Sequence, residues 1–124
     1  MQFINIKRLI KSFHYAIQGI GYALKTQQNM RVHRLMMLLI ICLGLFLKLT
    51  AIEWIFIFIC CGLVIASELI NTALETVVDL STSDINFKAK IAKDCAAAAV
   101  LIFAIMSLVI GLIIFIPKIF KMFS

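Results

Sequence analysis

The spacing of hydrophobic residues in the first 25 positions predicts an amphipathic helix. Apolar side chains recur at three- and four-residue steps, which is the spacing of one helix face. This face consists of Phe3, Ile6, Ile10, Phe13, Ile17, Ile20 and Leu24. The opposite face carries Lys7, Arg8, Lys11 and Gln18. A basic amphipathic helix lies in the membrane interface, where its cations meet lipid headgroups, so we expect a surface helix at about 3–25.

Three longer apolar segments follow, at about 32–51, 54–79 and 95–116. Each reaches the roughly 20 residues that a membrane-spanning helix needs. Lys48 interrupts the first segment, and its long side chain can extend to the interface. The second is uncharged from Trp54 through Ser67 and then becomes acidic, whereas the third has no charge and is ended by Pro117. No repeat or long linker divides the chain, so we expect one membrane domain over 1–124.

The composition agrees with several helices in a bilayer. Of the 124 residues, 64% are hydrophobic and 15% are charged, and the mean hydropathy is +1.10. Average soluble domains are about 45–50% apolar, and a short soluble domain buries only about 60–70% of its unfolded surface. We therefore predict an all-α integral membrane protein, and we set aside a disordered chain, a disulfide scaffold and a DNA-binding domain.

The net charge of +6 follows the apolar segments instead of forming a nucleic-acid patch. The cations before the first span or between the second and third are Lys7, Arg8, Lys11, Lys25, Arg31, Arg34, Lys88, Lys90 and Lys93. The cations on the other side are Lys48, Lys118 and Lys121. Since positive loops stay in the cytoplasm, we expect the N-terminus and the 81–93 loop there, and no nucleic-acid partner.

The second predicted span ends in an acidic stripe, which consists of Glu68, Asn71, Glu75 and Asp79. These residues stand at i, i+3, i+7 and i+11, so they lie within about 80° of one another on a helix. A charged carboxylate inside a membrane costs several kcal/mol, so the stripe must face a protein interior or a wet cleft. A functional site is one interpretation, and a polar contact that holds helices together is the other.

The stripe and the basic loop after it suit phosphate chemistry. Carboxylates are hard oxygen ligands of the kind that Mg²⁺ prefers, and Lys88, Lys90 and Lys93 could hold an anion. A carboxylate base, a metal carboxylate and a lysine near phosphate are the parts that phosphoryl transfer requires. No Walker A motif or dinucleotide-binding fingerprint occurs. The residues alone thus predict an anion or metal site at the cytoplasmic membrane surface, without naming a nucleotide.

Two motifs resemble the prokaryotic diacylglycerol kinase family, which includes the undecaprenol kinases. They are Glu68-x-x-Asn71-Thr72-Ala73-x-Glu75-x-x-x-Asp79 and Ala89-Lys90-Ile91-Ala92-Lys93-Asp94-Cys95-Ala96-Ala97-Ala98-Ala99-Val100-Leu101. Upstream similarities are Arg8-Leu9-Ile10-Lys11, Tyr15, Gly19 and Asn29-x-Arg31-x-His33. The resemblance covers nearly the whole chain. It implies a multi-pass protein of the bacterial cytoplasmic membrane, a homotrimer of three-span subunits with active sites where subunits meet.

The resemblance also implies a lipid kinase that uses ATP and Mg²⁺, with roles for particular residues. Glu68 would be the catalytic base that takes the proton of the lipid hydroxyl, and Asn71 would orient the reacting groups. Glu75 would bind Mg²⁺, while Arg31 would lie with Glu68 near the lipid headgroup. The positions implied for nucleotide binding are Arg8, Tyr15, Glu75, Asp84, Asn86, Lys93 and Asp94.

Gln27 departs from the family pattern, which usually has a second metal carboxylate there. This chain reads Thr26-Gln27-Gln28-Asn29. Gln27 offers a carbonyl oxygen to a metal but no charge. The departure is consistent with weaker Mg²⁺ binding, with compensation by another acid such as Asp79, or with an impaired enzyme.

Diacylglycerol and undecaprenol both remain candidate substrates, although Asn29-x-Arg31-x-His33 looks more like the undecaprenol kinase branch. The competing class is a non-enzymatic membrane protein, a small channel or assembly subunit whose acidic stripe is structural. A channel needs polar residues across the whole bilayer, whereas this stripe stops at Glu68. His14 and His33 are expected at the membrane interface, not as ligands or bases.

Overall fold

The computed structural model describes residues 3–124, which form four helices and no strand. The helices are α1 (Ile6–Thr26), α2 (Gln28–Leu47), α3 (Ala51–Ser81) and α4 (Phe87–Met122). Of these, α2, α3 and α4 are long and apolar enough to cross a membrane. The predictions of an all-helical chain and of three long apolar helices are confirmed. A helix also forms at the N-terminal end, and its position at the membrane surface stays a prediction.

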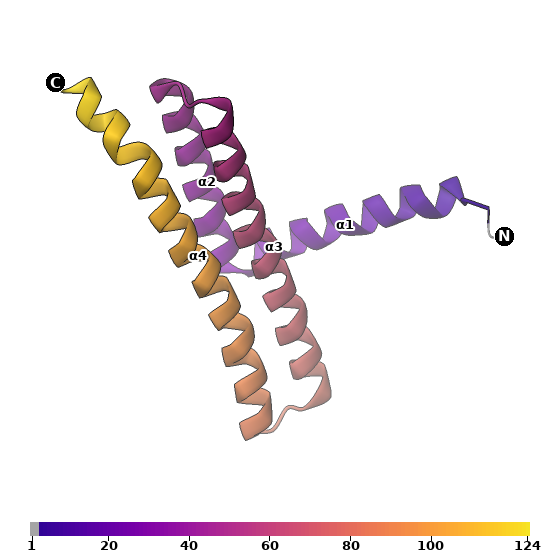
Figure 1. The fold of residues 1–124 in the computed structure, drawn as a ribbon. Coiled ribbons are helices and arrows are strands. Elements are labelled where there is room, and N and C mark those ends of the chain that lie inside the picture. Colours follow the sequence, from indigo (N-terminus) through magenta and orange to yellow (C-terminus); the bar gives the residue numbers. More distant parts are fainter. Residues whose placement is uncertain (1–2) are drawn as a thin grey trace.

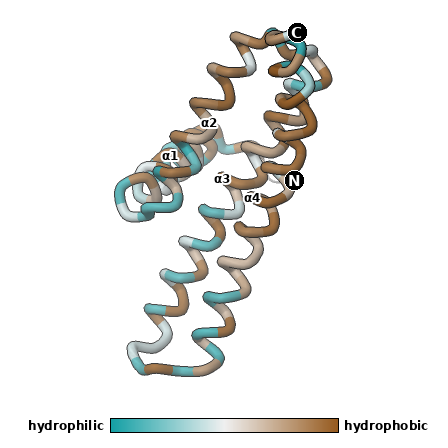
Figure 2. Tube along the Cα trace, turned by 90° about the vertical axis from the view of Figure 1, so that its left-hand side faces the viewer, coloured by the Kyte–Doolittle hydropathy of each residue, from teal (hydrophilic) through white to brown (hydrophobic). Residues whose placement is uncertain are grey.

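The long helices α3 and α4 run side by side in opposite directions, and α2 packs against α3 (Figure 1). Helix α1 leaves this bundle at a steep angle, so the N-terminal end lies far from the C-terminus (Figure 1). Figure 2 shows that hydrophilic positions gather where α3 and α4 approach their connection at 82–86, and that the middle of the bundle is largely hydrophobic. The acidic stripe therefore lies toward the polar end of the bundle.

Large apolar side chains cover the outer faces of the long helices. Phe46 on α2, Phe58 on α3 and Ile113 on α4 are each exposed on the single chain. In water such a surface would be unusual for a monomer, whereas lipid tails solvate it and the helices satisfy their own backbone hydrogen bonds. The exposed surface thus agrees with membrane insertion.

Local signals set the helix ends. The side chain of Asn5 accepts a hydrogen bond from the Arg8 N–H at 3.2 Å and caps α1. Helix α3 begins with a capping box, in which Thr50 and Glu53 each accept a hydrogen bond from the other's backbone N–H at 3.3 Å. These contacts satisfy N–H groups that have no partner within a helix.

The long helices differ from the predicted spans at both ends, since they run over 28–47, 51–81 and 87–122 instead of about 32–51, 54–79 and 95–116. Two of these differences have a local cause. Helix α2 ends at Leu47, before the predicted limit of 51, because Lys48 adopts a left-handed conformation with φ of 55° and turns the chain. Helix α4 continues through Pro117 to Met122. Proline removes one backbone donor from the helix, and membrane helices tolerate this loss where neighbouring groups compensate.

The end of the bundle that holds the α2–α3 turn is closed by apolar packing and one ion pair. Leu49, Ile57 and Phe115 form a buried cluster there. Beside them, Lys118 Nζ on α4 lies 3.1 Å from Glu53 Oε2 on α3. Since both charged side chains are half-buried, the pair fastens the start of α3 to the end of α4.

Replacing Gly44 by alanine is expected to lower the free energy of unfolding by about 1–2 kcal/mol, a typical cost of overpacking. A Cβ at this position would lie 2.8 Å from the Trp54 ring and 2.9 Å from Leu49 Cδ1. Gly111→Ala on α4 is the control, because a Cβ there meets nothing within 4 Å and alanine favours a helix. Thermal unfolding in detergent micelles measures both, and equal midpoints would contradict close packing at Gly44.

Candidate active site

The acidic stripe places its members at different depths along α3. Glu68 and Asn71 are buried, with exposed fractions of 1% and 5%. Glu75 is half-buried and Asp79, one turn further on, is exposed. The helical spacing puts them on one side of α3, so the stripe runs from the protein interior to the polar end of the bundle.

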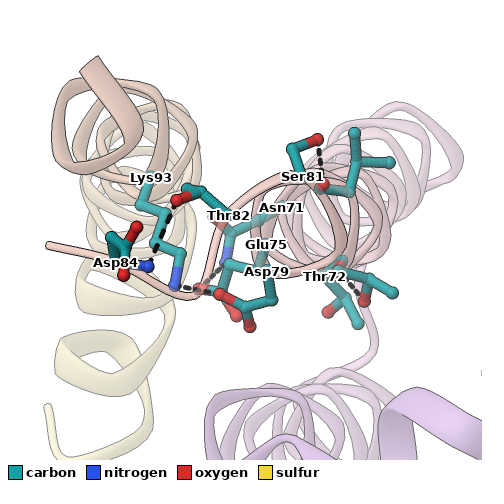
Figure 3. A network of polar contacts seen from close by, with 10 residues as sticks. Asn71, Thr72, Glu75, Asp79, Ser81, Thr82, Asp84 and Lys93 are labelled. Carbon is teal, nitrogen blue, oxygen red and sulfur yellow. Dashed lines mark hydrogen bonds and ion pairs between the residues drawn. The ribbon is translucent and has the colours of Figure 1, made fainter. Parts of the chain in front are cut away.

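Three buried oxygen atoms of the stripe have no hydrogen-bond partner. They are both carboxylate oxygens of Glu68 and Oδ1 of Asn71. The Asn71 amide Nδ2 donates to Glu75 Oε1 at 3.2 Å (Figure 3), which leaves the Asn71 carbonyl oxygen free. Buried polar atoms are normally paired, because an unpaired one costs its desolvation energy. This stretch of α3 therefore keeps acceptors that a ligand can use.

His33 on α2 approaches the buried end of the stripe. Its Nε2 atom lies 3.9 Å from Glu68 Oε2. Among residues 3–124, His33 is the one basic side chain within ion-pair distance of Glu68. The sequence predicted His33 at the membrane interface, outside the site. The motif Asn29-x-Arg31-x-His33 was the signal that could have included it.

Lys93 joins the exposed end of the stripe to α4. Its Nζ atom lies 2.5 Å from Asp79 Oδ1, across the two helices (Figure 3). Asp94 instead pairs with Lys90, one turn earlier on the same helix. The structure thus brings Lys93 together with the stripe, and it gives Asp94 a partner within α4.

Asp84 and Asn86 lie in the exposed connection between α3 and α4. The Asn86 side chain accepts hydrogen bonds from the N–H groups of Lys88 at 2.8 Å and Ala89 at 3.3 Å, so it caps α4. The Asp84 N–H donates to Thr82 Oγ1 at 3.2 Å. Asn86 therefore has a local role in the fold that the sequence interpretation did not foresee.

The other predicted site residues lie on or near α1. Arg8 and Tyr15 are exposed on α1, and Arg31 is exposed on α2. Gln27 joins the two helices, with its N–H donating to Ala23 O at 2.8 Å and its side chain making no cap hydrogen bond. Within residues 3–124, no hydrogen bond or ion pair connects these four side chains to the acidic stripe.

Two hollows flank the site. One, of about 610 Å³, lies between α1 and α3 and is lined largely by small side chains, among them Ala16, Gly19, Ala73, Thr72 and Thr76. The other, of about 460 Å³, lies between α1, α2 and α3 and is apolar apart from one cation. Its lining includes Leu24, Arg34, Met37 and Leu69. Both volumes fall within the range of small-molecule sites.

The stripe offers oxygen atoms of the kind that bind a hard cation such as Mg²⁺. They are few, so water or substrate would have to supply the remaining ligands. No cluster of three or more His, Cys, Asp or Glu side chains that could hold a metal occurs in the described part of the chain. The site instead offers the Glu75 carboxylate beside the unpartnered Asn71 Oδ1. Mg²⁺ commonly keeps several waters and uses one or two carboxylates together with substrate phosphates, so this donor set fits Mg²⁺.

Three long apolar helices and a carboxylate buried midway along one of them define a helical membrane protein with a buried polar site. Residues 14–115 match the family described as prokaryotic diacylglycerol kinase. The chain belongs to the prokaryotic diacylglycerol kinase family, as its motifs predicted.

Relatives carry two kinds of name. The chain is 41% identical to the undecaprenol kinase of Bacillus subtilis over 114 residues, which covers 92% of this chain and 93% of that protein. It is also 41% identical to the diacylglycerol kinase of Synechocystis over 115 residues, which covers 92% of this chain and 66% of that protein. The diacylglycerol kinase of Haemophilus influenzae is 36% identical to this chain over 112 residues, which covers 90% of this chain and 95% of that protein.

Proposed function

We propose that the protein is an ATP- and Mg²⁺-dependent lipid kinase of a bacterial inner membrane. It transfers the γ-phosphoryl group of ATP to the hydroxyl group of a membrane lipid. The observation that carries the proposal is Glu68, a buried carboxylate whose two oxygens have no hydrogen-bond partner. A base in this state is ready to accept the proton of a lipid hydroxyl.

In the proposed step, the lipid hydroxyl oxygen attacks the γ-phosphorus while Glu68 accepts its proton. A phosphorus–oxygen bond forms to the lipid as the bond to the ADP oxygen breaks, so the products are ADP and a phosphorylated lipid. Asn71 orients the site, since its amide holds Glu75 at 3.2 Å. Phosphoryl transfer depends mainly on such positioning and on charge stabilisation.

Glu75 and the Asn71 carbonyl oxygen are the groups that would hold Mg²⁺, with Gln27 as a further oxygen donor. Held there, Mg²⁺ would supply positive charge against the ATP phosphates. Lys93 supplies a second positive charge. Because Asp79 pairs with it at the exposed end of the stripe, Lys93 exchanges this carboxylate for a phosphate when nucleotide binds.

The acidic stripe of α3 lies on one side of the membrane in this proposal. The stripe stops at Glu68, and from Trp54 to Ala66 the helix carries no charged side chain. This supports a one-sided site over a channel. The excess of cations on α1, in the first turns of α2 and in the first turns of α4 supports a cytoplasmic location for the N-terminus and for the 82–86 connection.

We also propose a homotrimer, with each active site completed by a neighbouring subunit. The support is spatial, because α2, α3 and α4 of one chain are too few to enclose a nucleotide and a lipid headgroup together. Within residues 3–124, the side chains of Arg8, Tyr15 and Arg31 make no hydrogen bond or ion pair with the stripe of their own chain, so they are the residues that assembly would bring to a site. The mass of the protein–detergent complex by light scattering tests the trimer.

The kinase is tested by phosphate transfer from labelled ATP in mixed micelles. Purified protein receives diacylglycerol or undecaprenol separately, each with and without Mg²⁺. We expect a phosphorylated product on one of these lipids, only with Mg²⁺, which also assigns the substrate. Folded protein that phosphorylates neither lipid would contradict the proposal.

A further inference from the structure

The proposed kinase step leaves a proton on Glu68, and the burial of this side chain hinders the release of that proton to water. Glu68 is 1% exposed, so water has little access to its carboxyl group. Before another lipid hydroxyl can be deprotonated, that proton has to leave and the carboxylate has to recover its charge. A second group within reach of Glu68 is therefore needed for repeated turnover.

His33 is the group that the structure supplies. Its Nε2 lies 3.9 Å from Glu68 Oε2, and its side chain is 22% exposed. Histidine is the side chain that exchanges protons near neutral pH. The distance exceeds a direct hydrogen bond, but catalytic hydrogen bonds are often long before substrate binds and shorten in the complex. His33 thus connects a buried carboxylate to a more accessible position.

Other charged groups near this pair have different partners. Glu75 lies two turns further along α3 and accepts the hydrogen bond of Asn71. Lys93 of α4 pairs with Asp79. Neither α1 nor α4 contributes an ion pair to Glu68 or His33 within residues 3–124. Within residues 3–124, Glu68 and His33 therefore have no other charged side chain within ion-pair distance.

We propose that His33 is a positioning residue that orients Glu68 and accepts its proton after each transfer. The O–H bond of protonated Glu68 breaks as an N–H bond forms at His33 Nε2. Glu68 regains its negative charge, His33 becomes an imidazolium, and the imidazolium then releases the proton to water. The inference rests on the proposed kinase activity, because that reaction puts the proton on Glu68.

The test compares His33→Gln with wild type in the micelle assay. Glutamine is polar and of similar size but cannot carry a proton at neutral pH. We expect kcat to fall by about tenfold or more, while the KM values for ATP and lipid stay within about twofold. His14→Gln on α1 is the matched control, because His14 is exposed and far from Glu68 in the chain, and it should keep wild-type kcat.

Chemical rescue separates proton transfer from packing. In His33→Ala, imidazole added to the buffer should raise the rate, because the position is accessible. It should not raise the rate of wild type. A His33→Gln enzyme with wild-type kcat, or a folded His33→Ala enzyme that imidazole does not rescue, would overturn the inference. Wild-type protein that phosphorylates no lipid would instead contradict the kinase proposal itself.

Discussion

Glu68→Gln is expected to lower the rate of lipid phosphorylation by about 10²–10⁴-fold, the usual contribution of a general base. The amide keeps the size of the side chain but cannot accept the proton of a hydroxyl group. Because both Glu68 oxygens are buried without a partner, losing the charge removes a desolvation cost. We therefore expect the thermal unfolding midpoint of the variant to be equal to or above that of wild type.

The matched control is Glu53→Gln, at the other end of the same helix. Glu53 forms the capping box of α3 and pairs with Lys118. Glutamine also serves in a capping box, so we expect near-normal activity and a small loss of stability, about 0–1 kcal/mol for an ion pair of this kind. Kinetics in mixed micelles and thermal unfolding of both variants distinguish catalysis from folding. A Glu68→Gln enzyme that keeps its rate would remove Glu68 from the mechanism.

Glu75→Gln is expected to raise the Mg²⁺ concentration needed for half-maximal rate. This concentration should rise by about 10–100-fold or more, because losing a residue that only supports a metal ligand already weakens metal binding by that factor. The glutamine carbonyl can still accept the Asn71 hydrogen bond seen at 3.2 Å, so the substitution changes charge more than geometry. Titration of the rate with Mg²⁺ at saturating ATP measures the effect.

Gln27→Glu is the converse test, because it adds the carboxylate that the family pattern usually has. It should lower the Mg²⁺ requirement, and in the Glu75→Gln background it should recover part of the lost affinity. An unchanged Mg²⁺ dependence in Glu75→Gln would show that Glu75 is not a metal ligand. An unchanged dependence in Gln27→Glu alone would place Gln27 away from the metal and leave Glu75 in its role.

Much of the fold and the composition of the acidic stripe could be predicted from the sequence. Three apolar segments of sufficient length predicted α2, α3 and α4, because membrane helices satisfy their backbone hydrogen bonds internally. The acidic stripe could also be predicted from the sequence. Glu68, Asn71, Glu75 and Asp79 occupy one helix, and helical geometry alone sets their relative directions. The capping box at Thr50 and Glu53 is likewise local.

Contacts between helices depended on the tertiary structure. No spacing rule relates His33 on α2 to Glu68 on α3, or Lys93 on α4 to Asp79, since these distances depend on how separate helices pack. The sequence could not assign different depths to Glu68 and Asp79, because burial depends on what covers each turn of α3. The capping of α4 by Asn86 is instead a local contact, and asparagine is a preferred N-cap residue, so the sequence carried this signal. The sequence by itself determined which groups the protein carries and on which helix face. Packing decided which of them meet, because side chains on separate helices come together only where the bundle brings their backbones close.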